Sequence, residues 1–211
     1  MPIPNPIYLY RIIHIDNLKY ILQTGLVTSP TSDFADPNYI GIGDASLKLE
    51  RKNREIPIEP FGTFSDYVAF YFGNRSPMLY EIFHGYNGVT KRNQEEIIYL
   101  VSSYEKVEEL GLPYIYFDGH GYHKFSQVFN SRAGLEMIDW EAVKSRQWFD
   151  TEVDPDKKRR KQAEFLIFNG VPLPAIIGIG VYNRNVEEKT IRLLADEDTD
   201  IKTVVIPNWF Y

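Results

Sequence analysis

Short runs of aromatic and β-branched residues recur along the chain, and the short helical patterns between them follow no regular strand–helix alternation. Runs of this composition, bounded by turn-forming residues, are typical of β-strands. The predicted strands cover residues 7–13, 64–72, 96–101, 113–117, 165–168, 175–182 and 203–206. Because several of them carry aromatic residues on both faces, we expect an α+β fold with a largely antiparallel or mixed sheet rather than a doubly wound one.

Helix signals lie between several of these strands. Each predicted start is a residue that commonly caps a helix N-terminus, in some cases with a proline next or a glutamate three positions later. These starts are Asp16, Ser76, Ser102, Asp154 and Asn185. Gly25 and Gly111 are expected to end the helices that begin at Asp16 and Ser102. Residues 118–155 show few periodic signals, and we expect a functional loop there.

Length and composition are those of one globular domain, which we expect to span residues 1–211. The net charge of −6 argues against a protein coated by nucleic acid, but not against a local basic groove. The chain has no cysteine, which excludes disulfides, thiolate metal sites and cysteine nucleophiles. No apolar segment approaches the ~20 residues that span a bilayer, and the N-terminus lacks the regions of a signal peptide. We therefore predict a cytoplasmic protein without a membrane partner.

The usual metal and nucleotide motifs are missing or weak. His120-x-x-His123 has a spacing that metal ligands use, but no third ligand stands at a telling distance, so we predict no metal. The glycine pair Gly41-Ile-Gly43 lacks the third glycine of a Rossmann fingerprint, and no P-loop is present. A bound nucleotide therefore needs another binding mode.

Three segments can contribute to a ligand site, and each also has a plain structural interpretation. His14, at the exit of the first strand, either reaches a ribose hydroxyl or only orders the corner before the helix. Residues 66–78 are either a platform for stacking rings beside a phosphate or an aromatic core strand with a turn. Arg51 lies in a charged run typical of a solvated helix face, and nothing there separates it from Lys52 or Arg54.

Five consecutive basic residues, 157–161, precede Glu164, which stands directly before the apolar run Phe165-Leu-Ile-Phe168. A carboxylate at the edge of a buried strand can face a cleft, and basic residues beside it can hold a phosphate backbone. In the alternative interpretation the run is a solvated helix and Glu164 is structural. That alternative explains less well why a carboxylate directly precedes four large apolar residues.

Three segments together resemble the DarT family, the DNA ADP-ribosyltransferase toxins of DarT–DarG toxin–antitoxin systems. They are Tyr10-Arg-Ile-Ile-His14-Ile-Asp-Asn17-Leu, Asp66-Tyr-Val-Ala-Phe-Tyr-Phe-Gly-Asn-Arg-Ser-Pro-Met78-Leu and Gln162-Ala-Glu164-Phe-Leu. The resemblance implies the ADP-ribosyltransferase fold, with split β-sheets, an NAD⁺ cleft and flanking helices. It implies a toxin that transfers ADP-ribose from NAD⁺ to thymine bases in single-stranded DNA, releasing nicotinamide and blocking replication. NAD⁺ is then a co-substrate, no metal is needed, and the macrodomain antitoxin DarG is a partner.

The resemblance also implies roles for residues of this chain. Glu164 matches the catalytic glutamate, and Arg51 matches an arginine used in both catalysis and NAD⁺ binding. The residues expected to bind NAD⁺ are His14, Ile15, Asp16, Asn17, Gly25, Arg51 and Tyr71. Those expected to bind the DNA are Arg75, Met78, His120 and Arg159, with the rest of the basic run as further rim. Residues 118–161 are expected to shape the substrate site.

Two questions stay open at this level. Arg51 either accepts the thymine ring proton or acts as a fixed positive charge, since a guanidinium keeps its proton up to pH ~12. The acceptor of ADP-ribose is either thymine or another base, RNA or protein, or the enzyme only hydrolyses NAD⁺. A non-catalytic nucleic-acid-binding module, with Glu164 structural, is the remaining alternative.

Overall fold

The computed structural model of the chain describes residues 1–195, 197 and 199–211. Its strands are β1 (Tyr8–His14), β2 (Leu26–Val27), β3 (Tyr67–Tyr71), β4 (Ile97–Ser103), β5 (Tyr114–Phe117), β6 (Val128–Phe129), β7 (Glu164–Phe168), β8 (Val171–Pro172), β9 (Gly178–Val181) and β10 (Lys202–Val205). Its α-helices are α1 (Leu18–Thr24), α2 (Ala45–Lys52), α3 (Pro77–His84), α4 (Tyr104–Glu109), α5 (Trp140–Lys144), α6 (Lys157–Lys161) and α7 (Arg184–Leu194). Each predicted strand overlaps one of the longer strands, whereas β2, β6 and β8 are too short to show an alternating pattern.

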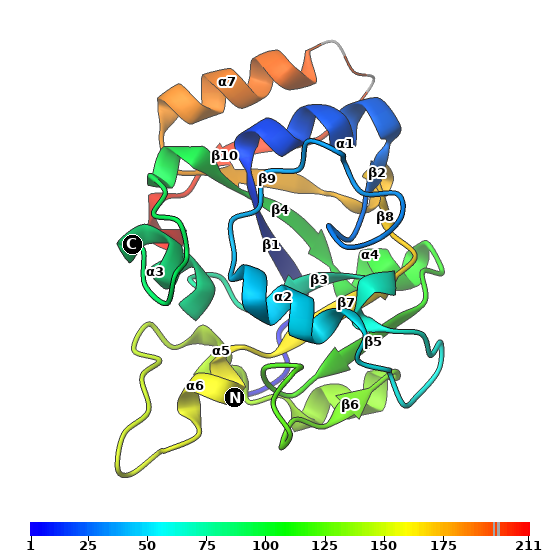
Figure 1. Cartoon of the computed structure of the whole chain (residues 1–211), viewed down its shortest axis with the longest axis vertical. Helices are drawn as coiled ribbons and strands as arrows, with labels where there is room; N and C mark the ends of the chain where they lie inside the picture. Colours follow the sequence, from blue (N-terminus) through cyan, green and yellow to red (C-terminus); the bar gives the residue numbers. More distant parts are fainter. Residues whose placement is uncertain (196, 198) are drawn as a thin grey trace.

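Within the described residues, eight strands form one sheet in the order β10-β9-β4-β1-β3-β7-β5-β6, and β2 pairs with β8 beside it (Figure 1). Neighbouring strands of the large sheet are antiparallel except β9 and β10, which are parallel. The predicted α+β fold with a mixed sheet is therefore confirmed.

The large sheet is split near its middle. β1 pairs with β4 along its whole length, and β3 pairs with β7 along its whole length. Between β1 and β3, by contrast, the register holds a single pair, Tyr10 and Tyr71. Beyond that pair a side chain joins the halves, because Arg11 Nη1 donates to the carbonyl oxygen of Ala69 at 2.8 Å. The predicted split sheet is present as two four-stranded halves that meet at this point.

The helix starts agree less well with prediction than the strands do. Ser76 caps α3 as predicted, accepting from the backbone N–H of Leu79, and Gly25 ends α1 with φ of 66°. The other four predicted starts are wrong by one or two residues, and the observed N-caps are Asn17, Ser103, Asp156 and Asn183. At α4 the reason is that β4 continues through Ser103, so the expected cap, Ser102, still belongs to the strand.

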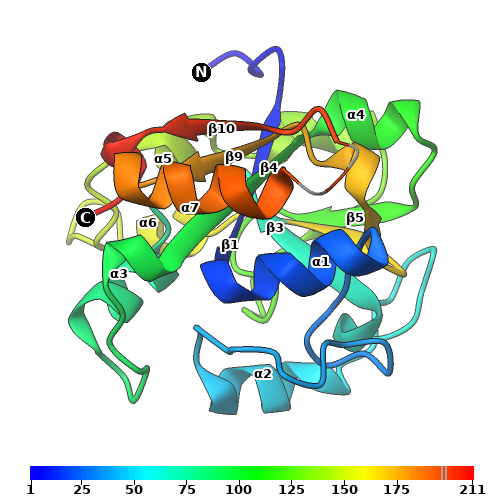
Figure 2. The same ribbon diagram turned by 90° about the horizontal axis from the view of Figure 1, so that it is seen from above.

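Helices lie on both sides of the large sheet. α7 packs against α1, β9 and β10, whereas α2 lies apart on one side, in front of the split in Figure 1 and at the edge of the view in Figure 2. No residue of α2 is buried, and its first turn is held by Asp44, whose carboxylate accepts from the backbone of Ser46 and Leu47. None of the helices in the described residues is long and apolar enough to cross a bilayer.

Residues 118–155 have little regular structure, in agreement with the prediction. They contain β6, α5 and a 3-10 helix (Arg132–Met137), joined by turns. The segment passes beneath the split sheet and returns through α6 directly into β7 (Figure 1). Its two ends therefore meet beside the first residue of β7, Glu164.

Candidate active site

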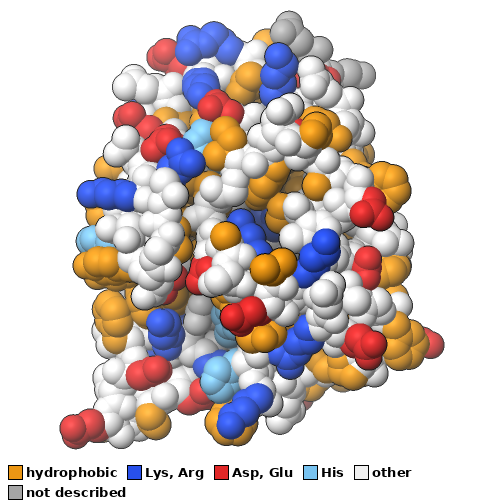
Figure 3. Space-filling view, in the orientation of Figure 1, with side chains coloured by type: hydrophobic (Ala, Val, Ile, Leu, Met, Phe, Trp, Pro, Cys, Tyr) orange, Lys and Arg blue, Asp and Glu red, His pale blue; other side chains and the backbone are white. Residues whose placement is uncertain are grey.

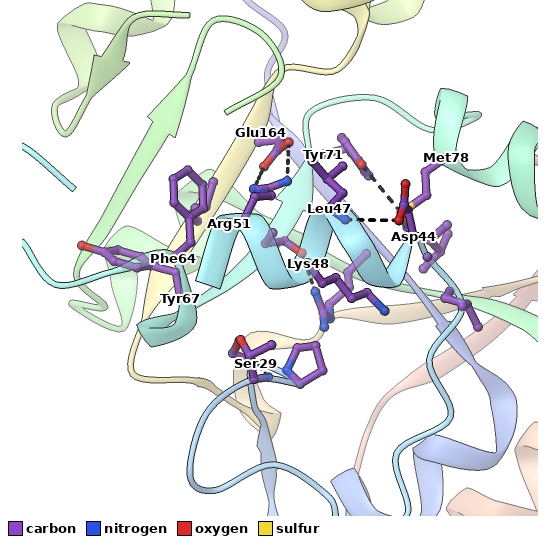
Figure 4. A pocket seen from close by; sticks show the side chains of 18 of the residues that line it. Ser29, Asp44, Leu47, Lys48, Arg51, Phe64, Tyr67, Tyr71, Met78 and Glu164 are labelled. Carbon is purple, nitrogen blue, oxygen red and sulfur yellow. Dashed lines mark hydrogen bonds and ion pairs between the residues drawn. The ribbon is translucent and has the colours of Figure 1, made fainter. Parts of the chain in front are cut away.

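A cavity of about 200 Å³ opens where the two halves of the sheet separate. β1, β3 and β7 form its floor, and α2 and the loop that precedes it form one wall. Figure 4 shows the side chains that point into it from these elements. The floor of the cavity opens because the strand ladder between the two halves stops at the Tyr10–Tyr71 pair.

Glu164 lies at the inner end of this cavity. It is the first residue of β7 and stands between Tyr71 of β3 and Phe117 of β5, so the neighbouring strands fix its backbone. The residue is 1% exposed, and its two carboxylate oxygens accept from Arg51 Nη2 at 2.6 Å and Nη1 at 3.2 Å. Burial would raise the pKa of Glu164, but the guanidinium of Arg51 and the other donors hold it below its ordinary value.

Arg51 is brought to Glu164 by the last turn of α2. Its guanidinium lies over the ring of Phe64, 4.6 Å from the centroid, and makes the paired bonds to the carboxylate with its outer nitrogens. Burial would lower the pKa of Arg51, yet the charge and hydrogen bonds of Glu164 outweigh it and raise the pKa above its ordinary value. Arg51 therefore carries a fixed positive charge in this arrangement.

The start of the irregular loop completes the surroundings of the carboxylate. The backbone N–H of Gly121 donates to Glu164 Oε1 at 3.3 Å, and His120 Nε2 lies 3.8 Å from the same oxygen. A Cβ on Gly121 would come within 3.3 Å of a Glu164 oxygen and closer still to Phe117, so a larger residue would displace this donor. Burial lowers the pKa of His120, only partly opposed by Glu164, so the imidazole is neutral at pH 7.

Tyr71 and Met78 also line the cavity. The Tyr71 hydroxyl contacts the Met78 sulfur at 4.0 Å, and burial raises the pKa of the Tyr71 hydroxyl. The cavity therefore brings together five of the residues that the sequence singles out: Glu164, Arg51, Tyr71, Met78 and His120.

The other residues expected to bind NAD⁺ lie outside the lining of this cavity. His14 is buried, and its Nδ1 accepts from the backbone of Asp16, so it orders the corner after β1 as in the second interpretation. Ile15 belongs to the core, Asp16 is bonded to Lys189, and Gly25 caps α1. Their contact with NAD⁺ stays a prediction.

Asn17 has a different position. Its side-chain amide exchanges two hydrogen bonds with the backbone of Ile40, at 2.9 and 3.0 Å, and so holds the loop that leads to α2. It also lines a second, smaller cavity, which shares Arg11 and Tyr39 with the first. Asn17 therefore positions the wall of the main cavity, and direct contact with NAD⁺ stays a prediction.

The basic run is not a solvated helix. Arg159 is bound by Asp118 at 3.0 Å and Asp156 at 2.8 Å, and Arg160 is bound by Asp139 and Asp154. Lys161 is 3% exposed and donates to the backbone oxygen of Val143 at 2.6 Å. The prediction that the whole run forms a rim for DNA is wrong for Lys161, because a buried ammonium cannot meet a phosphate. For Arg159 it stays a prediction.

Arg75 also lies apart from the cavity. It has a φ of 51°, and its guanidinium lies 4.4 Å from the centre of the Tyr211 ring, beside the C-terminus of the chain. Its contact with DNA stays a prediction.

Sequence reasoning missed four residues of the site: Arg11, Lys48 and Phe64, which line the cavity, and Gly121, whose backbone N–H donates to Glu164. The glycines on both sides of His120 are a signal that could have found Gly121, since a close backbone approach often requires glycine. Arg11, Lys48 and Phe64 have no such signal in the sequence. Each belongs to the site only because folding brings it next to residues that are distant in the sequence. No cluster of three metal-ligating side chains occurs in the part of the chain that the structure describes.

Comparison with known proteins identifies relatives along the full chain. The family described as "ssDNA thymidine ADP-ribosyltransferase, DarT" matches residues 10–211. A DNA ADP-ribosyl transferase of Thermus sp. (strain 2.9) is 36% identical over 212 residues, covering 99% of this chain and 98% of the relative. Two solved structures of Thermus sp. 2.9 DarT, each 34% identical, also superpose closely. The complex with ADP-ribosylated ssDNA has a TM-score of 0.92 and covers 100% and 99% of the two chains. The complex with NAD⁺ has a TM-score of 0.86 and covers 100% of both.

Proposed function

The chain belongs to the DarT family of ssDNA thymidine ADP-ribosyltransferases, and we propose that Glu164 and Arg51 are its catalytic residues. The reaction transfers ADP-ribose from NAD⁺ to thymine in single-stranded DNA. The observation that carries the proposal is the buried Glu164 carboxylate, held by two bonds from Arg51 at the end of a cavity in the split sheet. The ADP-ribosyltransferase fold predicted from the sequence is confirmed by the likeness to the DarT structures.

In the transfer step the bond between the ribose C1′ and the nicotinamide nitrogen breaks. Nicotinamide leaves with the electron pair, and positive charge develops on the ribose. A carboxylate has lone pairs left after binding one guanidinium, so Glu164 can also accept a bond from a ribose hydroxyl. Its negative charge then stabilises the charge that develops only in the transition state. The thymine N3 attacks C1′ and forms the new bond.

The N3 proton of thymine must leave as this bond forms. We propose that Arg51 is the electrostatic group and not the proton acceptor, because the Glu164 carboxylate raises its pKa. A fixed guanidinium stabilises the thymine anion, and the proton passes to Glu164 or to water. This choice is supported by the paired geometry, in which both outer nitrogens of Arg51 donate to the carboxylate.

Met78 and His120 are the proposed DNA contacts with the best structural support, because both line the cavity that holds Glu164. A reaction on an unpaired base avoids the cost of flipping it out of a duplex. Such a site needs only a short binding groove, which agrees with the acidic net charge of −6.

The test compares acceptors under one set of conditions. NAD⁺ labelled in its adenosine part is incubated with thymine-containing DNA, thymine-free DNA, RNA and a protein mixture, using wild type and Glu164→Ala. We expect label only on thymine-containing DNA, and only with wild type. Equal labelling of RNA, protein or thymine-free DNA would favour the alternative acceptors over thymine.

We further propose that the chain acts in the cytoplasm as the toxin of a toxin–antitoxin pair, with the macrodomain protein DarG as its antitoxin. This part is supported by the family resemblance alone. Expression of wild type in bacteria is expected to block replication, Glu164→Ala to be harmless, and coexpressed DarG macrodomain to restore growth. Normal growth with wild type, or no rescue by the macrodomain, would contradict it.

A further inference from the structure

Arg11 lies at the split of the sheet with part of its side chain unpaired. It belongs to β1, lines the main cavity and also lines the smaller cavity beside it. Nη1 donates to the Ala69 carbonyl, which aims the guanidinium across the gap between the two halves. Nε is buried and, within the described residues, has no hydrogen-bond partner. A buried guanidinium nitrogen without an acceptor is costly unless a ligand supplies one.

Lys48 enters the same cavity from α2. It is half-buried, its ammonium lies 5.9 Å from the ring centre of Tyr39, and Tyr39 lines both cavities. Burial lowers the pKa of Lys48, and the positive charge of Arg11 lowers it further. Figure 3 shows basic side chains in the hollowed middle of this face. Two cations therefore share one partly desolvated cavity.

No carboxylate of the cavity lining forms an ion pair with Arg11 or Lys48 among the described residues, and Asp44 opposes the lowering of the Lys48 pKa only in part. Asp44 is committed to the cap of α2, and Glu81, from α3, accepts from Asn87. Among the described residues, neither Arg11 nor Lys48 lies within the 4.0 Å of a carboxylate that defines an ion pair. Glu164, the remaining carboxylate of the lining, is taken by Arg51. Like charges brought together in a low-dielectric site without a partner are typical of a site for an anion.

The position of Lys48 on α2, relative to Arg51, indicates which anion the cavity can hold. Lys48 and Arg51 are three residues apart on one helix, which is about 4.5 Å along its axis. In Figure 4, Lys48 lies between the Arg51–Glu164 pair and Ser29 at the other end of the cavity. A dinucleotide whose ribose meets Glu164 therefore passes its diphosphate along this part of α2 toward Ser29.

We infer that Arg11 and Lys48 form a diphosphate site, in which the two cations clamp the pyrophosphate of NAD⁺ between Glu164 and the far end of the cavity. The inference rests on the proposed function and names further binding residues for it. Because one cation comes from β1 and the other from α2, the bound diphosphate joins α2 to the sheet. α2 buries no residue of its own and is held to the sheet by the Arg51–Glu164 pair, so the ligand adds a second link between them.

Lys48→Met is the decisive variant, because it keeps the length of the side chain and α2 buries no residue whose loss would unfold the protein. Titration calorimetry with ADP-ribose is expected to show binding weakened about 10- to 100-fold, the usual size of a lost charge-assisted bond. Inorganic pyrophosphate is expected to compete with NAD⁺ on wild type and much less on the variant. In transferase assays KM for NAD⁺ rises while kcat at saturation changes little.

Lys19→Met is the matched control, since it removes the same charge from an exposed position on α1 that lines neither cavity. Arg11→Lys keeps the charge but loses the bond to Ala69, and is expected to weaken ADP-ribose binding less than Arg11→Met. The double variant Arg11→Met/Lys48→Met is expected to lose less than the product of the single effects, because both residues hold one diphosphate.

ADP-ribose affinity of Lys48→Met within 2-fold of Lys19→Met, or undiminished competition by pyrophosphate, would overturn the inference. Binding of ADP-ribose and pyrophosphate needs no catalysis. A chain that binds both through Lys48 but fails to modify DNA would therefore contradict the proposed function and leave the diphosphate site standing.

Discussion

At the scale of single residues, the pairing of Arg51 with Glu164 determines what each can do. Before the transfer step, a carboxylate that binds a guanidinium with both oxygens is ionised, and the guanidinium is protonated. The pair can therefore stabilise opposite charges at two places in one transition state. In the mechanism that we propose, positive charge on the ribose faces Glu164, and negative charge on the thymine ring faces Arg51.

Arg51→Lys tests whether the arginine is electrostatic or the proton acceptor. As a fixed charge, it is expected to lose about 10²- to 10³-fold in kcat on replacement, because lysine cannot reproduce the paired bonds. The shape of the pH–rate profile should stay unchanged. A new limb in the profile near the pKa of a lysine would identify residue 51 as the base. Arg54→Lys, three residues further along and just past the end of α2, is the control and should keep its rate, because Arg54 is bonded to the Tyr122 carbonyl and not to Glu164.

The lowered pKa of Glu164 also predicts a pH dependence of stability. A carboxyl whose pKa is lower in the folded than in the unfolded chain stabilises the fold above the unfolded value, near 4.5, and loses this contribution as pH falls through the folded value. Between pH 7 and pH ~3, wild type should therefore lose more unfolding free energy than Glu164→Gln. Denaturant unfolding across this range measures both curves, and parallel curves would contradict the assignment.

The site residues differ in how far the sequence alone can identify them. Glu164 is visible because a carboxylate directly before four large apolar residues is unusual in a buried strand. Arg51 is not separable from Arg54, since what distinguishes it is a partner 113 residues away. Lys48 and Arg11 cannot be identified from the sequence either, because only the folded sheet brings them into one cavity.

At the scale of secondary-structure elements, the basic run of α6 chiefly holds the irregular loop, residues 118–155, in place through ion pairs. We call the ion pairs of Arg159 and Arg160 the clasp. Its arginines bind carboxylates at both ends of that loop, and the backbone oxygen of Arg159 accepts from His120 at 3.0 Å. Because His120 and Gly121 border Glu164, the clasp holds the site as well as the loop. A run of like charges in the sequence gives no sign of this, since its partners lie elsewhere.

Arg160→Gln is expected to loosen the clasp. Loss of its bonds to Asp139 and Asp154 should lower the unfolding free energy by about 1 kcal/mol, the usual size for a partly exposed ion pair. Hydrogen exchange should become faster in residues 145–161, and kcat should fall. Arg146→Gln, on the exposed part of the same loop, serves as control. Exchange in 145–161 equal to that of wild type would show that the clasp does not hold the loop.

The strands are easier to predict than the helix ends for a physical reason. A strand's signal is spread over several aromatic and β-branched residues, as in residues 113–117. A cap, by contrast, depends on one hydrogen bond, and neighbouring serines compete for it. Ser102 has the stronger sequence signal, with Glu105 three positions later, but β4 continues through Ser103 and assigns the cap to Ser103.

At the scale of the whole molecule, the two halves of the sheet are interleaved along the chain. One half holds β1, β4, β9 and β10, and the other holds β3, β5, β6 and β7. No single cut of the chain separates them, so the split that forms the cavity is not a domain boundary. We therefore propose that residues 1–211 act as one ADP-ribosyltransferase domain.

One cooperative unfolding transition is the expected consequence. Scanning calorimetry of wild type should give a single peak whose calorimetric and van't Hoff enthalpies agree. ADP-ribose should shift the whole peak to higher temperature, because it binds the folded chain only. Two separable transitions, with ADP-ribose shifting only one of them, would show that the halves unfold independently.

We propose that Glu164 directs transfer of ADP-ribose to thymine. Mass spectrometry tests this on a single-stranded oligonucleotide with one thymine, after reaction with NAD⁺ and either wild type or Glu164→Ala. With wild type the oligonucleotide should gain the mass of one ADP-ribose, and fragmentation should place it on the thymine base. With Glu164→Ala, or with cytosine in place of the thymine, the mass should stay unchanged. Modification by Glu164→Ala at the wild-type rate, or of the thymine-free oligonucleotide, would contradict the claim.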